Sequence, residues 1–263
     1  MYQFQYFRPK SLDEARQLYE NNGDAKFLAG GQTLIPTLKQ RLAQPTALID
    51  LSAIAMSGIK VAGGTVTIGA GTKHNDVATS ADVQKAIPAL ANLASHIGDP
   101  AVRHMGTLGG SIANNDPAAD YPAAVLGLGA TVKTTSRTIN ADDYFTGMFE
   151  TALEEGEIVT EVAFPIPDKA AYMKFPNPAS RYAMVGVFVA KTKAGVRVAV
   201  TGAASSVFRE TAMEAALAKS FTPDAVANIK VAATNMNSDL HGSAEYRAHL
   251  VTVMAKRAVA AAQ

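Results

Sequence analysis

Two glycine pairs, each beside small polar residues, are the parts of this sequence best suited to binding an anion. Gly30-Gly31 ends the apolar stretch KFLAGG, and Gly109-Gly110 lies within TLGGS. Glycine lets backbone N–H groups approach a phosphate without interference from a Cβ atom, and the start of a helix adds a favourable dipole. Two such loops could hold the two phosphates of a dinucleotide from opposite sides. A plain strand-to-helix turn explains one isolated pair at least as well.

Two aspartates follow the second glycine pair. Asp116 and Asp120 could accept hydrogen bonds from ribose or ribityl hydroxyl groups. They could equally be structural, because Asp116-Pro117 is typical of a turn and Asp120 precedes Tyr121-Pro122 as the N-cap of a helix would. Both interpretations stay open on the sequence of these residues alone.

The sequence lacks the common motifs of other nucleotide, metal and hydrolytic sites. GAGTKH and GLGATV have no third glycine of the dinucleotide fingerprint, and no segment ends in the Lys-Ser/Thr of a P-loop. The five histidines show no spacing that would place two rings on adjacent turns of one helix, and no GxSxG motif is present. We therefore expect no metal site and no catalytic acid, base or nucleophile in this chain.

Composition favours a globular protein that binds small molecules or other proteins. The chain has 263 residues, 48% of them hydrophobic, with 24 basic residues against 23 acidic ones. This balance provides no excess of positive charge that would favour binding to nucleic acid or to an anionic membrane surface. Cysteine is absent, which excludes disulfides, thiolate zinc sites and any iron–sulfur cluster held by cysteines of this chain.

Apolar runs in the sequence are short. The run at residues 182–190 is well below the roughly 20 residues of a membrane-spanning helix. The opening residues MYQFQYFRPK have no apolar core of the kind found in signal peptides. We expect a cytoplasmic protein without an integral membrane segment.

Local patterns divide the chain into three units, at residues 1–56, 57–168 and 169–263. Ser11 and Glu14 predict a capping box that opens a helix, after which strand and helix patterns alternate through the first unit. Alternating apolar residues around Gly63-Gly64 predict a hairpin at the start of the second unit.

Later segments complete this α+β pattern. In the second unit we expect a helical region at 81–97, a loop-rich stretch at 103–122, and a strand within EIVTEVAFPIP. In the third we expect a hairpin about Lys193-Ala194-Gly195 and helices at 209–219, 223–234 and 243–262.

Five motifs, in their order along the chain, carry a resemblance to a known family. They are FLAGGQTLIP, IGAGTKHNDV, IGDPAVRHMGTLGGSIANNDPAADYPAA, EIVTEVAFP and DLHGSAEYRAHLVTVMAKRAV. Together they resemble the FAD-binding medium subunit of molybdenum hydroxylases, a group that includes the carbon monoxide dehydrogenase medium subunit and the flavin domain of xanthine dehydrogenase. The resemblance implies two FAD-binding subdomains of the vanillyl-alcohol oxidase (PCMH) type, at residues 1–56 and 57–168, followed by a C-terminal α+β domain at 169–263.

The resemblance also implies a set of cofactor-binding residues. In the family, the two glycine loops grip the pyrophosphate and the neighbouring ribityl chain of FAD, and an aspartate, a lysine and strand residues complete the site. These positions correspond here to Leu28, Ala29, Gly30, Gly31, Gln32, Thr33, Leu34, Ile35, Thr107, Leu108, Gly109, Gly110, Ser111, Asn114, Asp120, Val159, Thr160 and Lys174.

Three positions depart from the commonest family pattern. Gln32 stands where many members have histidine, and Ser111 where many have asparagine; both can still form hydrogen bonds, so the departures concern flavin tuning. Tyr182 stands where some relatives have an acidic residue, near Arg181 of a short segment that follows Lys174. Its ring could approach the flavin or pack within the third unit, and we favour packing.

Finally, the resemblance implies a function shared among several chains. A large subunit would carry the molybdenum cofactor, a small subunit two [2Fe–2S] clusters, and this chain the FAD that passes electrons to an external acceptor, in a dimer of heterotrimers. One alternative is a stand-alone FAD-dependent oxidase or dehydrogenase of a small molecule, which would need an acid or base beside the flavin. Another is a non-enzymatic member of the fold that serves only assembly and binds no flavin.

Overall fold

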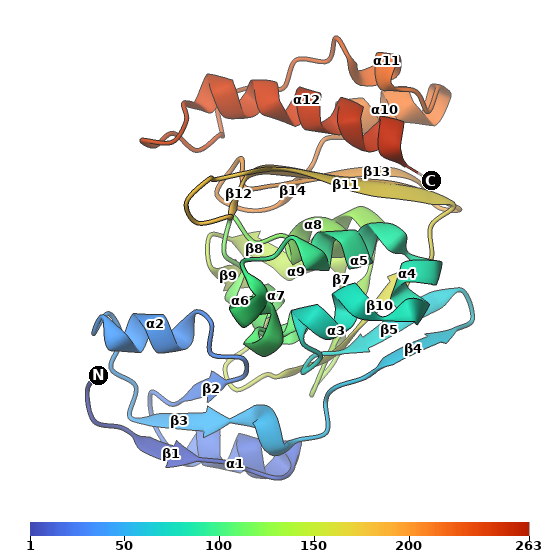
Figure 1. Ribbon diagram of the computed structural model, residues 1–263. Coiled ribbons are helices and arrows are strands. Elements are labelled where there is room, and N and C mark those ends of the chain that lie inside the picture. The colour runs from blue at the N-terminus through green and yellow to red at the C-terminus, as the bar shows by residue number, and fades with distance from the viewer. Residues whose placement is uncertain (263) are drawn as a thin grey trace.

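Three larger β-sheets follow one another along the molecule in the computed structural model, which describes residues 1–262 (Figure 1). Each sheet lies within one of the three predicted residue ranges. A separate two-stranded ribbon joins β8 (Phe145–Gly147) and β9 (Glu150–Thr151). No helix within residues 1–262 is long and apolar enough to cross a membrane.

The first unit is a small parallel sheet with helices beside it. Its strand order is β1-β3-β2, and both outer strands run parallel to β3. The elements are β1 (Gln5–Phe7), α1 (Leu12–Asn21), β2 (Lys26–Leu28), α2 (Leu34–Lys39), β3 (Ala47–Asp50) and the 3-10 helix η1 (Leu51–Ala53). Few residues are buried here, and Ile158 of the second unit contributes to this small core.

The helix predicted from Ser11 and Glu14 is confirmed as α1. The Ser11 side chain accepts a hydrogen bond from the Glu14 backbone N–H. The Glu14 carboxylate accepts in return from the N–H of Lys10, one residue before the position expected for a capping box.

The second unit is an antiparallel sheet in the order β4-β5-β10-β6-β7, packed against a group of short helices. Its strands are β4 (Ile59–Ala62), β5 (Thr65–Gly69), β6 (Thr131–Thr134), β7 (Thr138–Asn140) and β10 (Val159–Pro165). The predicted hairpin is confirmed, because Gly63 and Gly64 join β4 to β5 with φ angles of 57° and 77°. Positive φ at both turn positions is the reason that glycine suits them.

The stretch at 103–122, expected to be rich in loops, is mostly helical. The helices of this unit are α3 (His74–Thr79), α4 (Ala81–Ala86), α5 (Pro88–Ser95), α6 (Pro100–Met105), α7 (Leu108–Asn114), α8 (Tyr121–Leu128) and α9 (Ala141–Tyr144). The glycine pair lies inside α7, whose first turn is capped by the Thr107 side chain. Gly109 is tolerated in this helix because it packs directly on Ala70, where a Cβ atom would have no room. The helical region expected at 81–97 is confirmed, although Pro88 divides it into α4 and α5.

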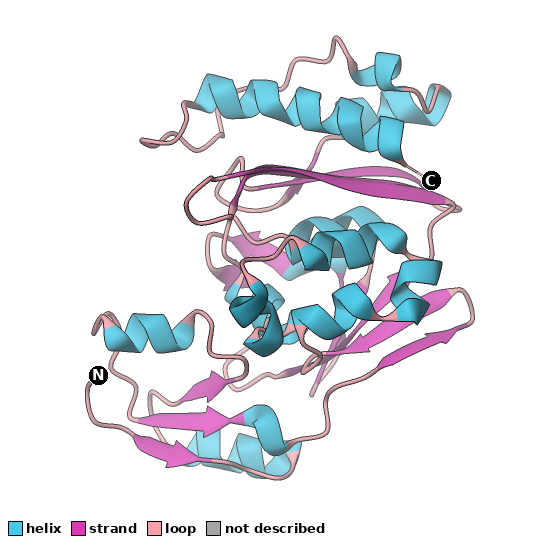
Figure 2. Ribbon diagram, viewed as in Figure 1, coloured by secondary structure: helices cyan, strands magenta, loops and turns pink. Residues whose placement is uncertain are grey.

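The third unit is an antiparallel sheet with helices on one face. The strand order is β11-β12-β13-β14, and α10 and α12 cover the face turned away from the second unit (Figure 2). The elements are β11 (Lys169–Pro176), β12 (Ala183–Thr192), β13 (Gly195–Thr201), β14 (Phe208–Arg209), α10 (Thr211–Lys219), α11 (Pro223–Val226) and α12 (Ala244–Ala261). The predicted hairpin is confirmed as β12 and β13, and α10 and α12 confirm two of the predicted helices. The helix expected over 223–234 is wrong beyond Val226, where the chain continues without a helix.

Helix α8 connects the second and third units. All eight of its residues are buried, because it lies between the helices of the second unit and the sheet strands β12 and β13. A helix that is apolar on every side needs such burial on every side. Gly127 allows close packing, since a Cβ atom there would lie 2.9 Å from a ring carbon of Phe188. The second and third units therefore share one core across α8, the third unit has a second core between its sheet and its helices, and the first unit has a core of its own.

Candidate functional site

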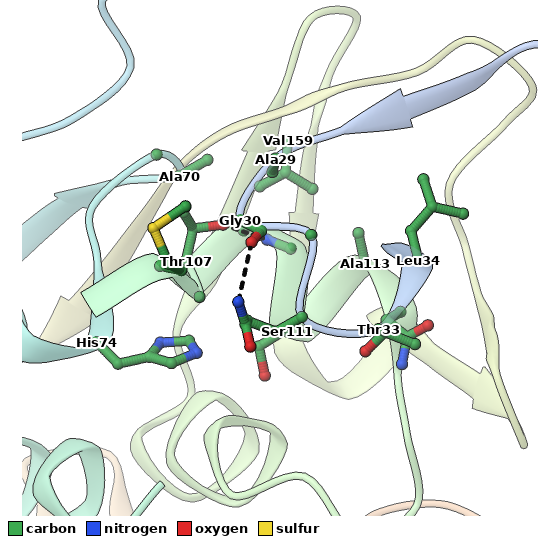
Figure 3. A pocket seen from close by; sticks show the side chains of 18 of the residues that line it. Ala29, Gly30, Thr33, Leu34, Ala70, His74, Thr107, Ser111, Ala113 and Val159 are labelled. Carbon is green, nitrogen blue, oxygen red and sulfur yellow. Dashed lines mark hydrogen bonds between the residues drawn. The ribbon is translucent and has the colours of Figure 1, made fainter. Parts of the chain in front are cut away.

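A cleft of about 760 Å³ lies where the first unit meets the other two. Its walls come from all three units, and Figure 3 shows part of it. The cleft brings together both predicted glycine loops, which are far apart in the sequence: Ala29–Thr33 between β2 and α2, called here the first loop, and the first turn of α7.

The first loop makes a very close backbone approach to the second unit. A Cβ atom on Gly30 would lie 2.2 Å from the Met105 carbonyl oxygen and 2.7 Å from the Gly106 Cα, so only glycine fits. Gly31 has a φ of +69°, in the left-handed region that favours glycine. The Gln32 side chain donates a long hydrogen bond of 3.4 Å to the Gly30 carbonyl oxygen, drawn as a dashed line in Figure 3.

Unpaired donors are concentrated in the first loop. Within residues 1–262, the backbone N–H groups of residues 31–34 donate to no protein acceptor. By contrast, N–H groups at the start of α7 are already paired: Leu108 donates to Thr72, Gly109 to Ala70 and Gly110 to the Thr107 side chain. The first loop therefore offers the N–H groups for an anion, and the turn with Gly109-Gly110 provides the close-packed opposite wall.

Most of the predicted cofactor-binding residues line this cleft, and four do not. The lining includes Leu28, Ala29, Gly30, Gly31, Gln32, Thr33, Leu34, Thr107, Gly109, Gly110, Ser111, Asn114, Asp120 and Val159. Ile35, Leu108, Thr160 and Lys174 are not part of the lining. Leu108 is fully buried and the Thr160 hydroxyl donates to the Lys133 carbonyl oxygen, so both have structural contacts instead.

Asp120 is held in a buried ion pair beside the cleft. One carboxylate oxygen accepts from the Tyr172 hydroxyl and the other from the Lys174 ammonium group at 2.9 Å. Burial raises the pKa of the Asp120 carboxyl, against the opposing effects of Lys174 and Tyr172. Both carboxylate oxygens of Asp120 therefore already accept hydrogen bonds within the protein. Because Tyr172 and Lys174 belong to β11, these bonds join the start of α8 to that strand. The Asp120 side chain makes no capping bond to α8, whereas Asp116 accepts from the Ala118 N–H as a turn residue would.

The third unit reaches the cleft through the turn between β11 and β12. Ser180, Arg181 and Tyr182 are part of the lining, and Arg181 has a φ of +62°, which is unusual for a residue with a Cβ atom. Tyr182 is 47% exposed. The expectation that Tyr182 packs inside the third unit is therefore wrong, because its side chain lies at the cleft.

Many cleft residues were not predicted as site residues from the sequence, and two of them, Lys73 and His74, carry polar side chains beside the second loop. Lys73 is the N-cap residue of α3 and His74 its first residue, and both line the cleft, because residue 73 forms an isolated β-bridge with Thr107. Burial, with a smaller contribution from Arg103, lowers the pKa of His74 to about 4, so its ring is neutral at pH 7. The motif IGAGTKHNDV pointed to this stretch, but nothing local showed that the His74 ring lies against Gly106 on the cleft wall.

These features fit a dinucleotide cofactor with charged phosphates. Free backbone donors, glycines that permit close approach and a lining drawn from three units are what a long, doubly charged ligand requires. In the described part of the chain, no group of three or more His, Cys, Asp or Glu residues is arranged to hold a metal ion.

Comparison with known proteins agrees with this arrangement. Residues 2–167 match the family described as the FAD binding domain in molybdopterin dehydrogenase, and residues 170–262 match the CO dehydrogenase flavoprotein C-terminal domain. The carbon monoxide dehydrogenase medium chain of Hydrogenophaga pseudoflava is 39% identical, over 98% of this chain and 96% of the relative. The nicotine 6-hydroxylase medium subunit of Paenarthrobacter nicotinovorans is 36% identical, over 97% of this chain and 95% of its own.

The solved structures support the same relationship. The carbon monoxide dehydrogenase of Hydrogenophaga pseudoflava that lacks the Mo-pyranopterin moiety contains a chain matching this one with a TM-score of 0.93 and 39% identity, over 99% of this chain and 97% of the other. This confirms the expected FAD-binding fold followed by a C-terminal α+β domain. The chain belongs to the family of FAD-binding medium subunits of molybdenum hydroxylases and is the flavoprotein subunit of an oxidoreductase.

Proposed function

We propose that this chain is the electron-transfer subunit of a multi-subunit molybdenum hydroxylase. Electrons released from substrate at the molybdenum cofactor of a large subunit would cross two [2Fe–2S] clusters of a small subunit and reach FAD on this chain. An external acceptor would then reoxidise the flavin. The observation that carries the proposal is one cleft, with two glycine turns for the cofactor, in a chain that has no cysteine for a cluster of its own.

The residues of this chain would bind and orient the cofactor. The N–H groups of residues 31–34 would donate to its phosphate oxygens, and Gly30 and Gly110 would keep the two walls close enough to hold it. Tyr182, at the cleft, would limit access of water. When bound, FAD supplies the redox chemistry, so a catalytic acid or base of this chain is not needed.

The assembly we propose is a dimer of heterotrimers with the large and small subunits, in the cytoplasm. Relatives are named as medium chains or medium subunits, which supports a complex of several chains. No nucleic-acid partner is proposed, since the charge is balanced.

The visible absorption spectrum of the tagged chain, purified from its native host with whatever it retains, tests this function. We expect flavin bands together with broad iron–sulfur absorption, and two further polypeptides in the preparation. Flavin bands alone, with turnover of a small substrate by the isolated chain, would favour a stand-alone oxidase. A colourless chain that does not take up added FAD would contradict every flavin function.

The Gly110→Val substitution tests the wall formed by α7. A Cβ atom here would lie 2.9 Å from the Thr107 Oγ1 and 3.7 Å from the Ala29 Cβ, so the branched side chain enters the space between the two loops. Gly110 has an ordinary helical backbone, and valine can adopt it. We expect FAD affinity to fall about tenfold or more, with near-native circular dichroism. Fluorescence titration of FAD measures the affinity, and unchanged binding would show that this wall does not hold the cofactor.

A further inference from the structure

His74 is a buried polar residue on the wall of the cleft to which no role has been assigned above. It is only 4% exposed and begins α3, where its backbone N–H donates to the Gly106 carbonyl oxygen at 3.0 Å. Its ring lies close against Gly106, since a Cβ atom there would be 2.5 Å from the His74 Nε2. The preceding residue, Lys73, forms a β-bridge with Thr107, and His74, Thr107 and Ser111 all line the cleft (Figure 3).

The protein leaves this ring without the hydrogen bond that normally fixes a buried histidine. Nδ1 is buried and has no hydrogen-bond partner in residues 1–262. Its neighbours are the Tyr121 ring, with centroids 5.3 Å apart, and the Arg103 side chain, which lowers its pKa further. A buried polar group without a hydrogen-bond partner lowers the stability of the folded protein. A leucine of similar size would avoid this cost, so packing alone does not explain a histidine here.

We propose that His74 binds the polar chain of FAD, between its two ring systems, through a hydrogen bond from its neutral imidazole. A neutral imidazole has one N–H donor and one acceptor nitrogen, and the tautomer and ring orientation can adjust to the ligand. A phosphate or ribityl oxygen held near Thr107 and Ser111 would be within the same part of the cleft. The inference deepens the proposed function, because it rests on FAD occupying this cleft.

Leucine and glutamine at position 74 separate a binding role from a structural one. We expect His74→Leu to weaken FAD affinity about tenfold, because the hydrogen bond is lost, while apo-protein stability stays unchanged or rises. His74→Gln keeps a donor and an acceptor, and should retain more affinity than leucine. Titration of flavin fluorescence with the full chain, freed of FAD, gives the affinity, and thermal unfolding of the same apo-protein gives the stability.

Tyr121→Phe provides the matched control. The Tyr121 hydroxyl is also buried without a partner, but Tyr121 is not part of the cleft lining, so its loss should leave FAD affinity unchanged. If wild type and Tyr121→Phe bind FAD and His74→Leu binds equally well, the inference is wrong and the proposed function stands. If His74→Leu destabilises the apo-protein and glutamine does no better than leucine in FAD binding, His74 is structural. If wild type itself takes up no FAD, the proposed function fails.

Discussion

Gly30→Ala is expected to weaken FAD binding by about a hundredfold or more, equivalent to about 2.7 kcal/mol. The added Cβ would lie 2.2 Å from the Met105 carbonyl oxygen, 2.7 Å from the Gly106 Cα and 2.8 Å from the Met105 carbonyl carbon. All three are backbone atoms, so no side chain can rotate away to relieve the contact. The first loop would have to move, and the free N–H groups of residues 31–34 would move with it.

Apo-protein stability should change much less in this variant. The first loop is only partly buried, and Gly30 belongs to none of the three main cores. Gly23→Ala is the matched control, because it makes the same chemical change in the same unit with nothing within 4 Å of the new Cβ. Isothermal titration with FAD compares the three proteins. Wild-type affinity in Gly30→Ala would show that the approach of the loop to α6 is not needed for binding.

The sequence predicted those elements whose signals are local. Ser11 and Glu14 cap α1 as expected, and Gly63-Gly64 form the turn between β4 and β5 because both take positive φ angles. The prediction at 103–122 was wrong for a reason that is not local. Glycine, asparagine and proline usually indicate loops, whereas here Gly109 is required by packing against Ala70 inside a helix. A packing requirement of this kind depends on a residue far away in the sequence.

The same distinction applies to the candidate site. Both glycine loops could be identified from composition and family resemblance, and they lie on the same cleft. The distribution of free N–H groups between them depends on acceptors at Ala70 and Thr72, which no local pattern reveals. Likewise, the pairing of Asp120 with Lys174 and Tyr172 joins α8 to a strand of another unit. His74 reaches the cleft through the bridge between residues 73 and 107.

Lys174→Met is expected to destabilise the protein strongly, because it breaks the buried ion pair with Asp120. The Lys174 and Asp120 side chains are only 6% and 5% exposed, with 2.9 Å between the ammonium nitrogen and the carboxylate oxygen. Removing one partner leaves the other charge buried with little compensation, which costs about 3 kcal/mol or more. Lys174 also donates to the His96 carbonyl oxygen, so a contact between the second and third units is lost as well. Urea unfolding of the apo-protein at pH 7 measures the deficit.

The loss of stability caused by Lys174→Met should depend on pH, in a direction set by the titration of Asp120. Burial raises the pKa of this carboxyl in the folded protein, and removal of Lys174 takes away the main opposing interaction. A group with a raised folded-state pKa lowers stability as pH rises from its unfolded value, about 4, through its folded value. The deficit of Lys174→Met should therefore be small in acid, where Asp120 is protonated in both states, and full at pH 7.

The double variant Asp120→Asn with Lys174→Met removes the titrating group, so it should recover part of the stability and lose this pH dependence. An equal deficit at every pH, or no recovery in the double variant, would mean that Lys174 acts through packing and its backbone contact and not through the charge of Asp120.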